Sequence, residues 1–175
     1  MGLFAYNSGT IKRLNVSVSG NVVFEDAKND MVNSSNSFIG CISAVNAGSI
    51  EDCTIQGSLS ASYTGISDIM SIGSITGYNS GDIPRCWSSL SLLVEGSFTG
   101  SGARARTVSI GGIVGENSGL IHDCMNSGML TAIMQDDLTV MQMPITRLYG
   151  GGIAGISEYG EITGCIQAAN AVILQ

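Results

Sequence analysis

Hydrophobic and small residues recur at fixed places along the chain, in a block that appears five times. The clearest copy runs from Ile110 to Cys124, related copies span 39–53, 72–86 and 150–165, and a degenerate copy spans 1–14. The isoleucines of the Gly-x-Ile segment in successive copies are 39, 33, 38 and 41 residues apart. A variable period with constant columns predicts a fixed structural unit whose copies are joined by connections of different length.

Six columns can be followed down the aligned copies. Two hold large apolar residues, one holds small residues, and the other three hold mainly Asn, Gly and Cys. In order along the block, the columns are Leu3, Ile42, Ile75, Ile113 and Ile153; Ala5, Ala44, Gly77, Gly115 and Gly155; Asn7, Asn46, Asn79 and Asn117; Gly9, Gly48, Gly81, Gly119 and Gly160; Ile11, Ile50, Ile83, Ile121 and Ile162; and Leu14, Cys53, Cys86, Cys124 and Cys165. The last copy departs from the Asn column.

The residues that follow each Cys indicate β-strands. Leu90, Leu92 and Val94 are two positions apart, as are the small and apolar residues at 128–132, and this spacing places side chains on one face of a strand. The Ile and Cys columns are three positions apart, which predicts a bend between two strands with both residues facing inward. A unit of about 23 residues with three short strands suits one coil of a β-helix.

Each column then has a physical role, because successive coils lie about 4.8 Å apart and like residues stack on like. The Ile column fills the core, and the small column lets the sheet turn without colliding with the opposite wall. The Asn-x-Gly step supplies a turn, since Asn and Gly tolerate positive φ. The stacked Asn side chains are expected to form a ladder of amides.

The predicted fold is all-β, a single parallel β-helix or β-solenoid of about five coils in one domain over 1–175. The coils are expected at about 1–23, 39–61, 72–94, 110–132 and 150–173. The connections, near 24–38, 62–71, 95–109 and 133–149, are expected to protrude as loops, and the two longest to form hairpins or extra strands beside the stack. Because neither end carries a polar cap, the chain is expected to be a fragment whose parent continues at the solenoid ends.

The columns resemble the GLUG motif, a repeat of bacterial cell-surface proteins that is named for its Gly-Leu-any-Gly core. Gly112-Ile113-Val114-Gly115 and Gly152-Ile153-Ala154-Gly155 carry that core, with weaker forms at 41–44 and 74–77. The resemblance covers nearly all of the chain except the connections. It implies β-solenoid architecture and a bacterial surface or extracellular location, as in adhesin-like proteins and the non-catalytic region of immunoglobulin A proteases.

Composition narrows the classes of function. Hydrophobic residues make up 44% of the 175 residues and charged residues only 12%, with 24 Gly and a formal net charge of −7. Disordered chains lack this many apolar residues, and long helices do not tolerate this much Gly. No basic cluster exceeds Arg104 and Arg106, so nucleic acid is not an expected partner. No apolar run is long enough to predict membrane insertion.

The five cysteines are expected to be structural. No C-x-x-C pair occurs, and the aligned cysteines are 33, 38 and 41 residues apart, which does not fit zinc-ribbon spacing. In one inward column, Cys53, Cys86, Cys124 and Cys165 would act as small hydrophobic groups. Neighbouring thiols would be within disulfide range, although parallel Cβ vectors would strain the bond. Cys41 is expected to be more exposed.

His122 and three carboxylate pairs are the remaining candidates for catalysis. The residues aligned with His122 predict an outward, solvent-tolerant column, and neither a zinc-protease motif nor a calcium or phosphate-loop motif occurs, so no cofactor or metal is expected. Carboxylate pairs serve β-helix enzymes that act on acidic polysaccharides. The pairs are Glu25-Asp26, Glu51-Asp52 and Asp136-Asp137.

Two functions remain open. The leading hypothesis is a non-catalytic structural or adhesive module that binds a host or matrix protein or glycan through loops. The connections 95–109 and 133–149 would emerge side by side and bring Arg104 and Arg106 towards Asp136 and Asp137. The alternative is a carbohydrate-active β-helix enzyme, a polysaccharide lyase or hydrolase that uses loop carboxylates. Three or more acidic and basic side chains converging on one outer face of neighbouring coils would favour the enzyme.

Overall fold

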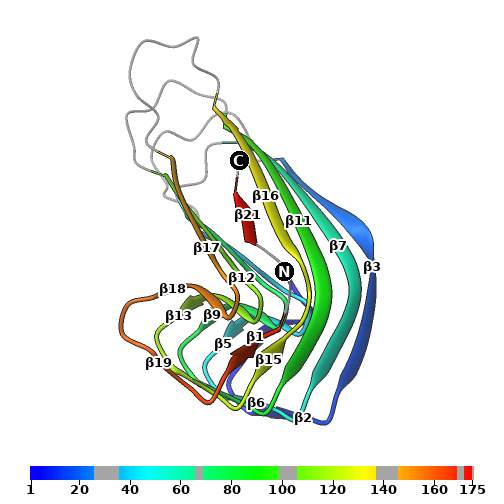
Figure 1. Cartoon of the computed structure of the whole chain (residues 1–175), viewed down its shortest axis with the longest axis vertical. Coiled ribbons are helices and arrows are strands. Elements are labelled where there is room, and N and C mark those ends of the chain that lie inside the picture. The colour runs from blue at the N-terminus through cyan, green and yellow to red at the C-terminus, as the bar shows by residue number, and fades with distance from the viewer. Residues whose placement is uncertain (26–35, 66–68, 99–105, 137–145, 169–171, 175) are drawn as a thin grey trace.

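The chain winds through four parallel β-sheets, coil upon coil (Figure 1). The computed structural model describes residues 1–25, 36–65, 69–98, 106–136, 146–168 and 172–174, and these residues form 21 strands and no helix. Strands pair in parallel with the equivalent strands of the neighbouring coils, for example β6 with both β2 and β10. The prediction of an all-β parallel solenoid is confirmed.

Two sheets of short strands form one end of each coil, and both follow the predicted columns. Sheet A contains β1 (Phe4–Asn7), β5 (Ser43–Asn46), β9 (Thr76–Asn79), β13 (Val114–Asn117) and β18 (Ala154–Ser157). Sheet B contains β2 (Thr10–Lys12), β6 (Ser49–Glu51), β10 (Asp82–Pro84), β14 (Leu120–His122) and β19 (Glu161–Thr163).

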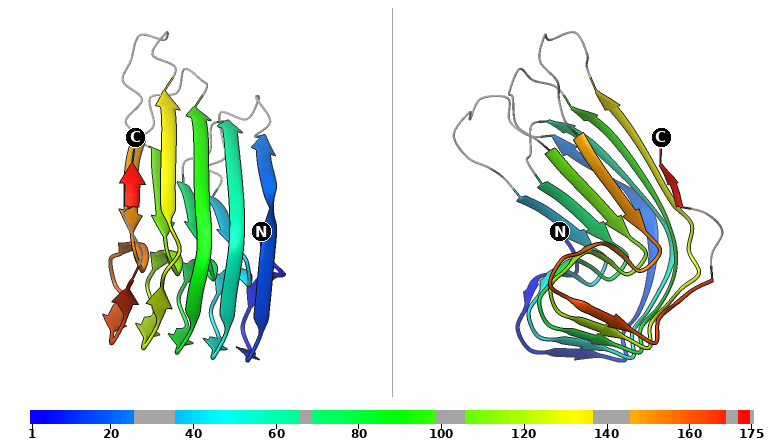
Figure 2. Two further views of the ribbon diagram at one scale, coloured as in Figure 1. Left: turned by 45° about the vertical axis from the view of Figure 1, so that its right-hand side comes forward. Right: turned by 60° about the vertical axis from the view of Figure 1, so that its left-hand side comes forward.

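The other two sheets extend away from that end (Figure 2). Sheet C contains β3 (Asn15–Glu25), β7 (Thr54–Gly65), β11 (Trp87–Phe98), β15 (Met125–Asn126) with β16 (Leu130–Asp136), and β20 (Ile166–Gln167) with β21 (Val172–Leu174). Sheet D contains β4 (Asn36–Gly40), β8 (Ile69–Gly73), β12 (Arg106–Gly111) and β17 (Thr146–Gly151). Three inner coils, β4–β7, β8–β11 and β12–β16, thus lie between a first coil, β1–β3, and a last coil, β17–β21.

Sheet D is the main departure from the sequence prediction, which gives each coil three strands. The connections are predicted as loops from residues 95 to 109 and 133 to 149, yet β11 continues to Phe98 and β12 begins at Arg106, both in register with neighbouring coils. The same holds for β16 and β17 in the next connection. The prediction of hairpins or extra strands beside the stack is therefore wrong for these residues, because they lie within the stack as its fourth wall. The residues between them, 99–105 and 137–145, lie outside the described residues.

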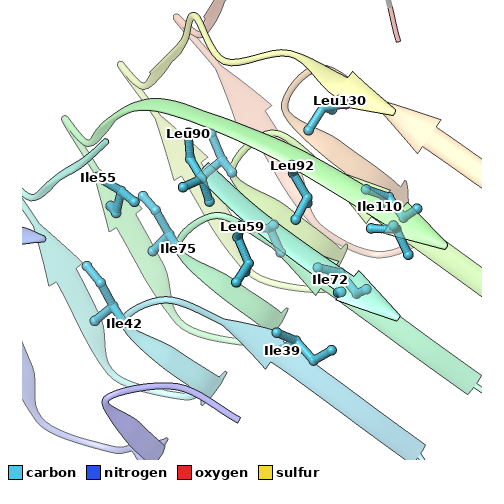
Figure 3. Packing of buried hydrophobic residues seen from close by; sticks show 14 of the residues in the cluster. Ile39, Ile42, Ile55, Leu59, Ile72, Ile75, Leu90, Leu92, Ile110 and Leu130 are labelled. Carbon is cyan, nitrogen blue, oxygen red and sulfur yellow. The ribbon is translucent and has the colours of Figure 1, made fainter. Parts of the chain in front are cut away.

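The core lies between the sheets and runs along the whole stack. Ile39, Ile72 and Ile110 of sheet D lie opposite Leu59, Leu92 and Leu130 of sheet C (Figure 3). The inner-coil members of the two predicted columns of large apolar residues lie in the same core, where Ile50, Ile83 and Ile121 are completely buried, whereas Leu3 and Ile162 of the end coils are exposed. Apolar burial at about 25 cal/mol per Å² is the main stabilising contribution of these columns.

A column of left-handed residues makes the bend between sheets B and C. Its members lie one residue before the Cys column and have φ between 53° and 62°: Arg13, Asp52, Arg85, Asp123 and Gly164. One left-handed residue reverses the inside-outside alternation, so the Ile and Cys on either side of it both face the core. The predicted bend between the Ile and Cys columns is confirmed, and this left-handed column is its cause.

Candidate functional surfaces

The Asn column forms the predicted amide ladder. The Nδ2 atom of Asn46 donates to Oδ1 of Asn79 at 2.8 Å, and Asn79 donates to Asn117 at the same distance. Asn79 Oδ1 also accepts from the Gly81 amide of its own turn at 3.2 Å. In the last coil Ser157 takes the place of Asn and accepts through Oγ at 3.3 Å. Buried amides are stable here because each finds partners above, below and in its own turn.

The Gly column has a steric cause that differs from the predicted one. None of its members has positive φ, which among the described glycines occurs only at Gly57 and Gly164. A Cβ on Gly48, Gly81 or Gly119 would instead lie about 2 Å from the carbonyl oxygen of the preceding coil's glycine. These glycines are required because the turns of successive coils touch through their backbones.

Cys53, Cys86 and Cys124 lie in the core as free thiols, as predicted, and Cys165 of the last coil is half-buried. Each sulfur also bonds the preceding coil: Cys86 Sγ accepts from the Cys53 amide at 3.4 Å and donates to the Ile50 carbonyl at 3.2 Å. The thiols therefore satisfy backbone groups that the bend removes from the regular ladder. A side-chain hydrogen bond with the Cys86 thiol lowers the pKa of the Cys53 thiol to about 7, but only 1% of Cys53 is exposed, so reagents have little access to it. Burial raises the pKa of Cys41 to about 12, and Cys41 is half-buried, which makes it more exposed than Cys53, Cys86 and Cys124.

The left-handed column and the strand before it carry a ladder of charges on the outer corner between sheets B and C. Arg85 lies between the acidic residues of the preceding coil: Nε donates to Asp52 Oδ1 at 2.7 Å, and Nη2 donates to Asp52 Oδ2 at 3.0 Å and to Glu51 Oε2 at 3.3 Å. Lys12 approaches Glu51 from the first coil at 3.8 Å. The hydrogen bonds from Arg85 hold the pKa of Asp52 below its ordinary value. We call Lys12, Glu51, Asp52, Arg85, His122 and Asp123 the charged corner.

His122 continues this corner on the outside of the stack, as predicted. Its Nδ1 lies 3.0 Å from Asp123 Oδ2, and its Nε2 lies 3.5 Å from Asp82 Oδ1. The hydrogen bond with Asp123, supported by the charge of Asp82, raises the pKa of the imidazole above its ordinary value of 6.5. The corner therefore brings acidic and basic side chains from adjacent coils together, which meets the condition set for a catalytic surface.

A second surface lies where sheets A and D meet, and we call it the A–D seam. Phe38 of β4 packs against Tyr78 of β9 with ring centroids 5.5 Å apart. One coil further, Ser71 of β8 donates to Glu116 of β13 at 3.4 Å. Burial raises the pKa of Glu116, and the nearby charge of Glu158 acts in the same direction. No cation among the described residues forms an ion pair with Glu116.

The four residues predicted to form a mixed-charge loop surface lie at the ends of the described strands or beyond them. Arg106 begins β12 in sheet D, and Asp136 ends β16 in sheet C. Arg104 and Asp137 lie outside the described residues, so this surface stays a prediction. Sequence reasoning missed the charged corner, although the alternation Arg13, Asp52, Arg85, Asp123, one residue before the column that begins with Leu14 and continues with Cys, was a visible signal in the first four copies.

The described residues contain no group of three or more His, Cys, Asp or Glu side chains that could hold a metal ion. The described part of the chain also offers no helix with the length and apolar character that a membrane crossing requires. Comparisons with known proteins give no relative: no family model, curated protein or solved structure matches this chain. The resemblance to the GLUG repeat therefore stays a prediction.

Proposed function

We propose that this chain is a non-catalytic structural and adhesive module of a bacterial surface or secreted protein. The observation that carries the proposal is the unbroken register of the stack. From Ile11 to Ile162, every described strand of sheet B pairs with its equivalent in the next coil, and the Asn, Ile and Cys columns are used for packing. A rigid rod of this kind suits a spacer that displays its connections.

The charged corner supports the same proposal through the way its charges are used. Arg85 gives three hydrogen bonds to Asp52 and Glu51, and His122 lies between Asp82 and Asp123. Groups that neutralise each other hold coils together, whereas a catalytic acid or base needs a free position beside its substrate. We infer that partners, a protein or a glycan, bind through the connections between sheets C and D.

Adhesion can be tested with fibronectin-coated and collagen-coated plates and a printed glycan array. In the test variant, Gly-Ser segments of equal length replace residues 99–105 and 137–145. Because the strands on either side are paired within the sheets, we expect this variant to fold with an unchanged denaturation midpoint and to lose binding. Arg85→Ala is the matched control, with the corner altered and the connections intact. Undiminished binding by the replaced variant would exclude the connections as the binding surface.

A polysaccharide lyase is the second candidate, because the charged corner meets the stated condition. An elimination reaction needs a base that takes a proton and a cation beside the substrate carboxylate, and within the corner we assign these roles to His122 and Arg85. The test is incubation with pectate and alginate while the ultraviolet absorbance of the unsaturated product is followed. Activity that His122→Gln abolishes would support the lyase, and no absorbance change with either polymer would exclude lysis of these two substrates.

A further inference from the structure

The exposed large apolar side chains gather on the two end coils. Nine of the eleven such residues among the described ones belong to the first or the last coil. The first coil exposes Met1, Leu3, Phe4, Tyr6 and Val23, and the last exposes Tyr149, Tyr159, Ile162 and Ile166. The two termini lie at opposite ends of the stack (Figure 2). Both ends also present strands whose outer backbone edge has no neighbour among the described strands.

No contact within the chain explains why residue 9 is a glycine. In the same column, a Cβ on Gly48 would lie 2.1 Å from the Gly9 carbonyl oxygen, and one on Gly81 would lie 2.0 Å from that of Gly48. A Cβ on Gly9 meets nothing within 4 Å. Its φ is not positive, so its conformation does not require glycine either. A coil stacked beneath the first one would impose on Gly9 the constraint that the other members obey.

The A–D seam shows which strands such a coil would bring together. A Cβ on Gly77 would lie 2.5 Å from the Ile39 amide nitrogen, and one on Gly115 equally close to that of Ile72. β9, β13 and β18 therefore rest on the sheet D strand of the preceding coil. Among the described residues the first coil has no sheet D strand, so β1 and β5 lack a strand of this kind to rest on, and β17 lacks a following strand of sheet A.

Two exposed tyrosines fit this gap. Tyr6 lies in the column of Tyr78, and Tyr149 lies in the column of Phe38. Phe38 and Tyr78 already form an aromatic pair across the seam. Placing β1 on β17 would pair Tyr6, which is 61% exposed, with Tyr149, which is 41% exposed, in the same way.

We propose that the last coil binds the first coil of a second copy of this chain, head to tail. In this arrangement Leu3 stacks on Ile153, Ile11 on Ile162, and the Asn7 side chain continues the amide ladder beyond Ser157. The charges are complementary, because the first coil carries Lys12 and Arg13 and the last carries Glu158 and Glu161. The two faces differ, so the contact is heterologous and, unless it closes into a ring, builds an open filament.

Gly9→Leu tests the proposal without disturbing the isolated chain. A Cβ at this position has no atom of the chain within 4 Å, whereas a leucine here would collide with the glycine carbonyl of a coil stacked beneath it. Gly20→Leu is the matched control: its Cβ also meets nothing, and its column holds Leu59, Leu92 and Leu130, so a leucine there is compatible with stacking. Sedimentation velocity and electron microscopy of the wild type and Gly20→Leu should show assemblies that grow with concentration. Gly9→Leu should sediment as a monomer with an unchanged thermal midpoint.

Two further measurements keep the test decisive. Gly9→Leu retains a free last coil, so a small fraction of it mixed with the wild type should shorten the assemblies. Tyr6→Asp, a change at an exposed side chain, should weaken assembly independently of Gly9. A wild type that remains monomeric at every concentration would overturn the inference and leave further coils of the same polypeptide as the occupant. Assembly of Gly9→Leu equal to that of Gly20→Leu would also overturn it.

Discussion

Two neighbouring columns of the solenoid follow opposite rules. The column Cys53, Cys86, Cys124 and Cys165 repeats one residue in the core, whereas the column one residue earlier, Arg13, Asp52, Arg85 and Asp123, alternates charge on the surface. Inside, identical small side chains stack on one another and bond the coil beneath. Outside, identical charges one coil apart would repel, and opposite charges attract. The same repeat distance therefore favours repetition in one column and alternation in the other.

A charge placed in the core should cause the largest loss of stability, because the inner columns hold only uncharged side chains. We expect Ile83→Asp to unfold the chain, because it buries an unpaired carboxylate at a cost of several kcal/mol against a total stability of about 5–15 kcal/mol. Asp82→Ala, one residue away, should cost less than about 1 kcal/mol, since it removes an outward side chain. Denaturant titration compares the two, and equal midpoints would contradict the placement of Ile83.

Removal of one amide from the interior ladder should have an intermediate effect. Asn79→Ala removes hydrogen bonds to Asn46 and Asn117 and leaves buried polar atoms without partners, at an expected cost of about 1–3 kcal/mol. Asn7→Ala is the control at the end of the ladder, where Asn46 is the only amide of the ladder that loses a partner, and should cost less. The ladder account fails if the terminal substitution proves as costly as the central one in urea titration.

Reversal of one charge at the charged corner tests whether the alternation of charge in the outer column stabilises the stack. Arg85→Glu would place three acidic residues in successive positions of the column, so we expect a lower denaturation midpoint than for Arg85→Ala. The difference should shrink in concentrated salt, because the Debye length falls from about 30 Å at 0.01 M to about 3 Å at 1 M. A loss that stays constant over this range would show that packing of the Arg85 side chain, not its charge, is responsible.

Titration of His122 gives the smallest expected effect. Its pKa is raised in the folded state, mainly by Asp123, so its contribution to stability is fully present below its ordinary value of 6.5 and is lost as pH rises through the folded pKa. Nuclear magnetic resonance titration of this single histidine should give a pKa above 6.5 that Asp123→Asn lowers. An unchanged pKa in that variant would remove Asp123 as the main cause.

The columns were predictable because packing in a stacked coil leaves little choice of residue. Asn79, Gly81, Ile83 and Cys86 recur since each contacts its own equivalent, so the sequence displays the structure directly. The positions of the Asn ladder, the bend and the core all follow from this. The steric role of the glycines was not predictable, because it depends on the distance between two backbones.

Sheet D escaped prediction for a related reason. Phe38, Ser71, Ser109 and Tyr149 form one of its columns, which combines two aromatic residues with two serines. Phe38 contacts Tyr78 across the seam, whereas Ser71 contacts Glu116, so the sheet A partners of the column differ. A column whose partners vary carries no common residue type. The corner was hidden in the same way, since alternating Arg and Asp resemble unrelated surface residues until the coils are aligned.

The overlap between sheets A and D has a mechanical consequence. In a simple stack, a plane between two coils would cross only the backbone hydrogen bonds between paired strands and the side-chain contacts between equivalent residues. In this solenoid the same plane also crosses the contacts of Phe38 with Tyr78 and of Ile72 with Gly115, because sheet A of one coil packs on sheet D of the preceding coil. A pulling force along the axis is therefore shared between the ladders and the overlapping side chains. Separation of two coils requires shear at the A–D seam as well as rupture of the sheets. The force needed to detach one coil should therefore be larger than the backbone hydrogen bonds between two coils alone would require.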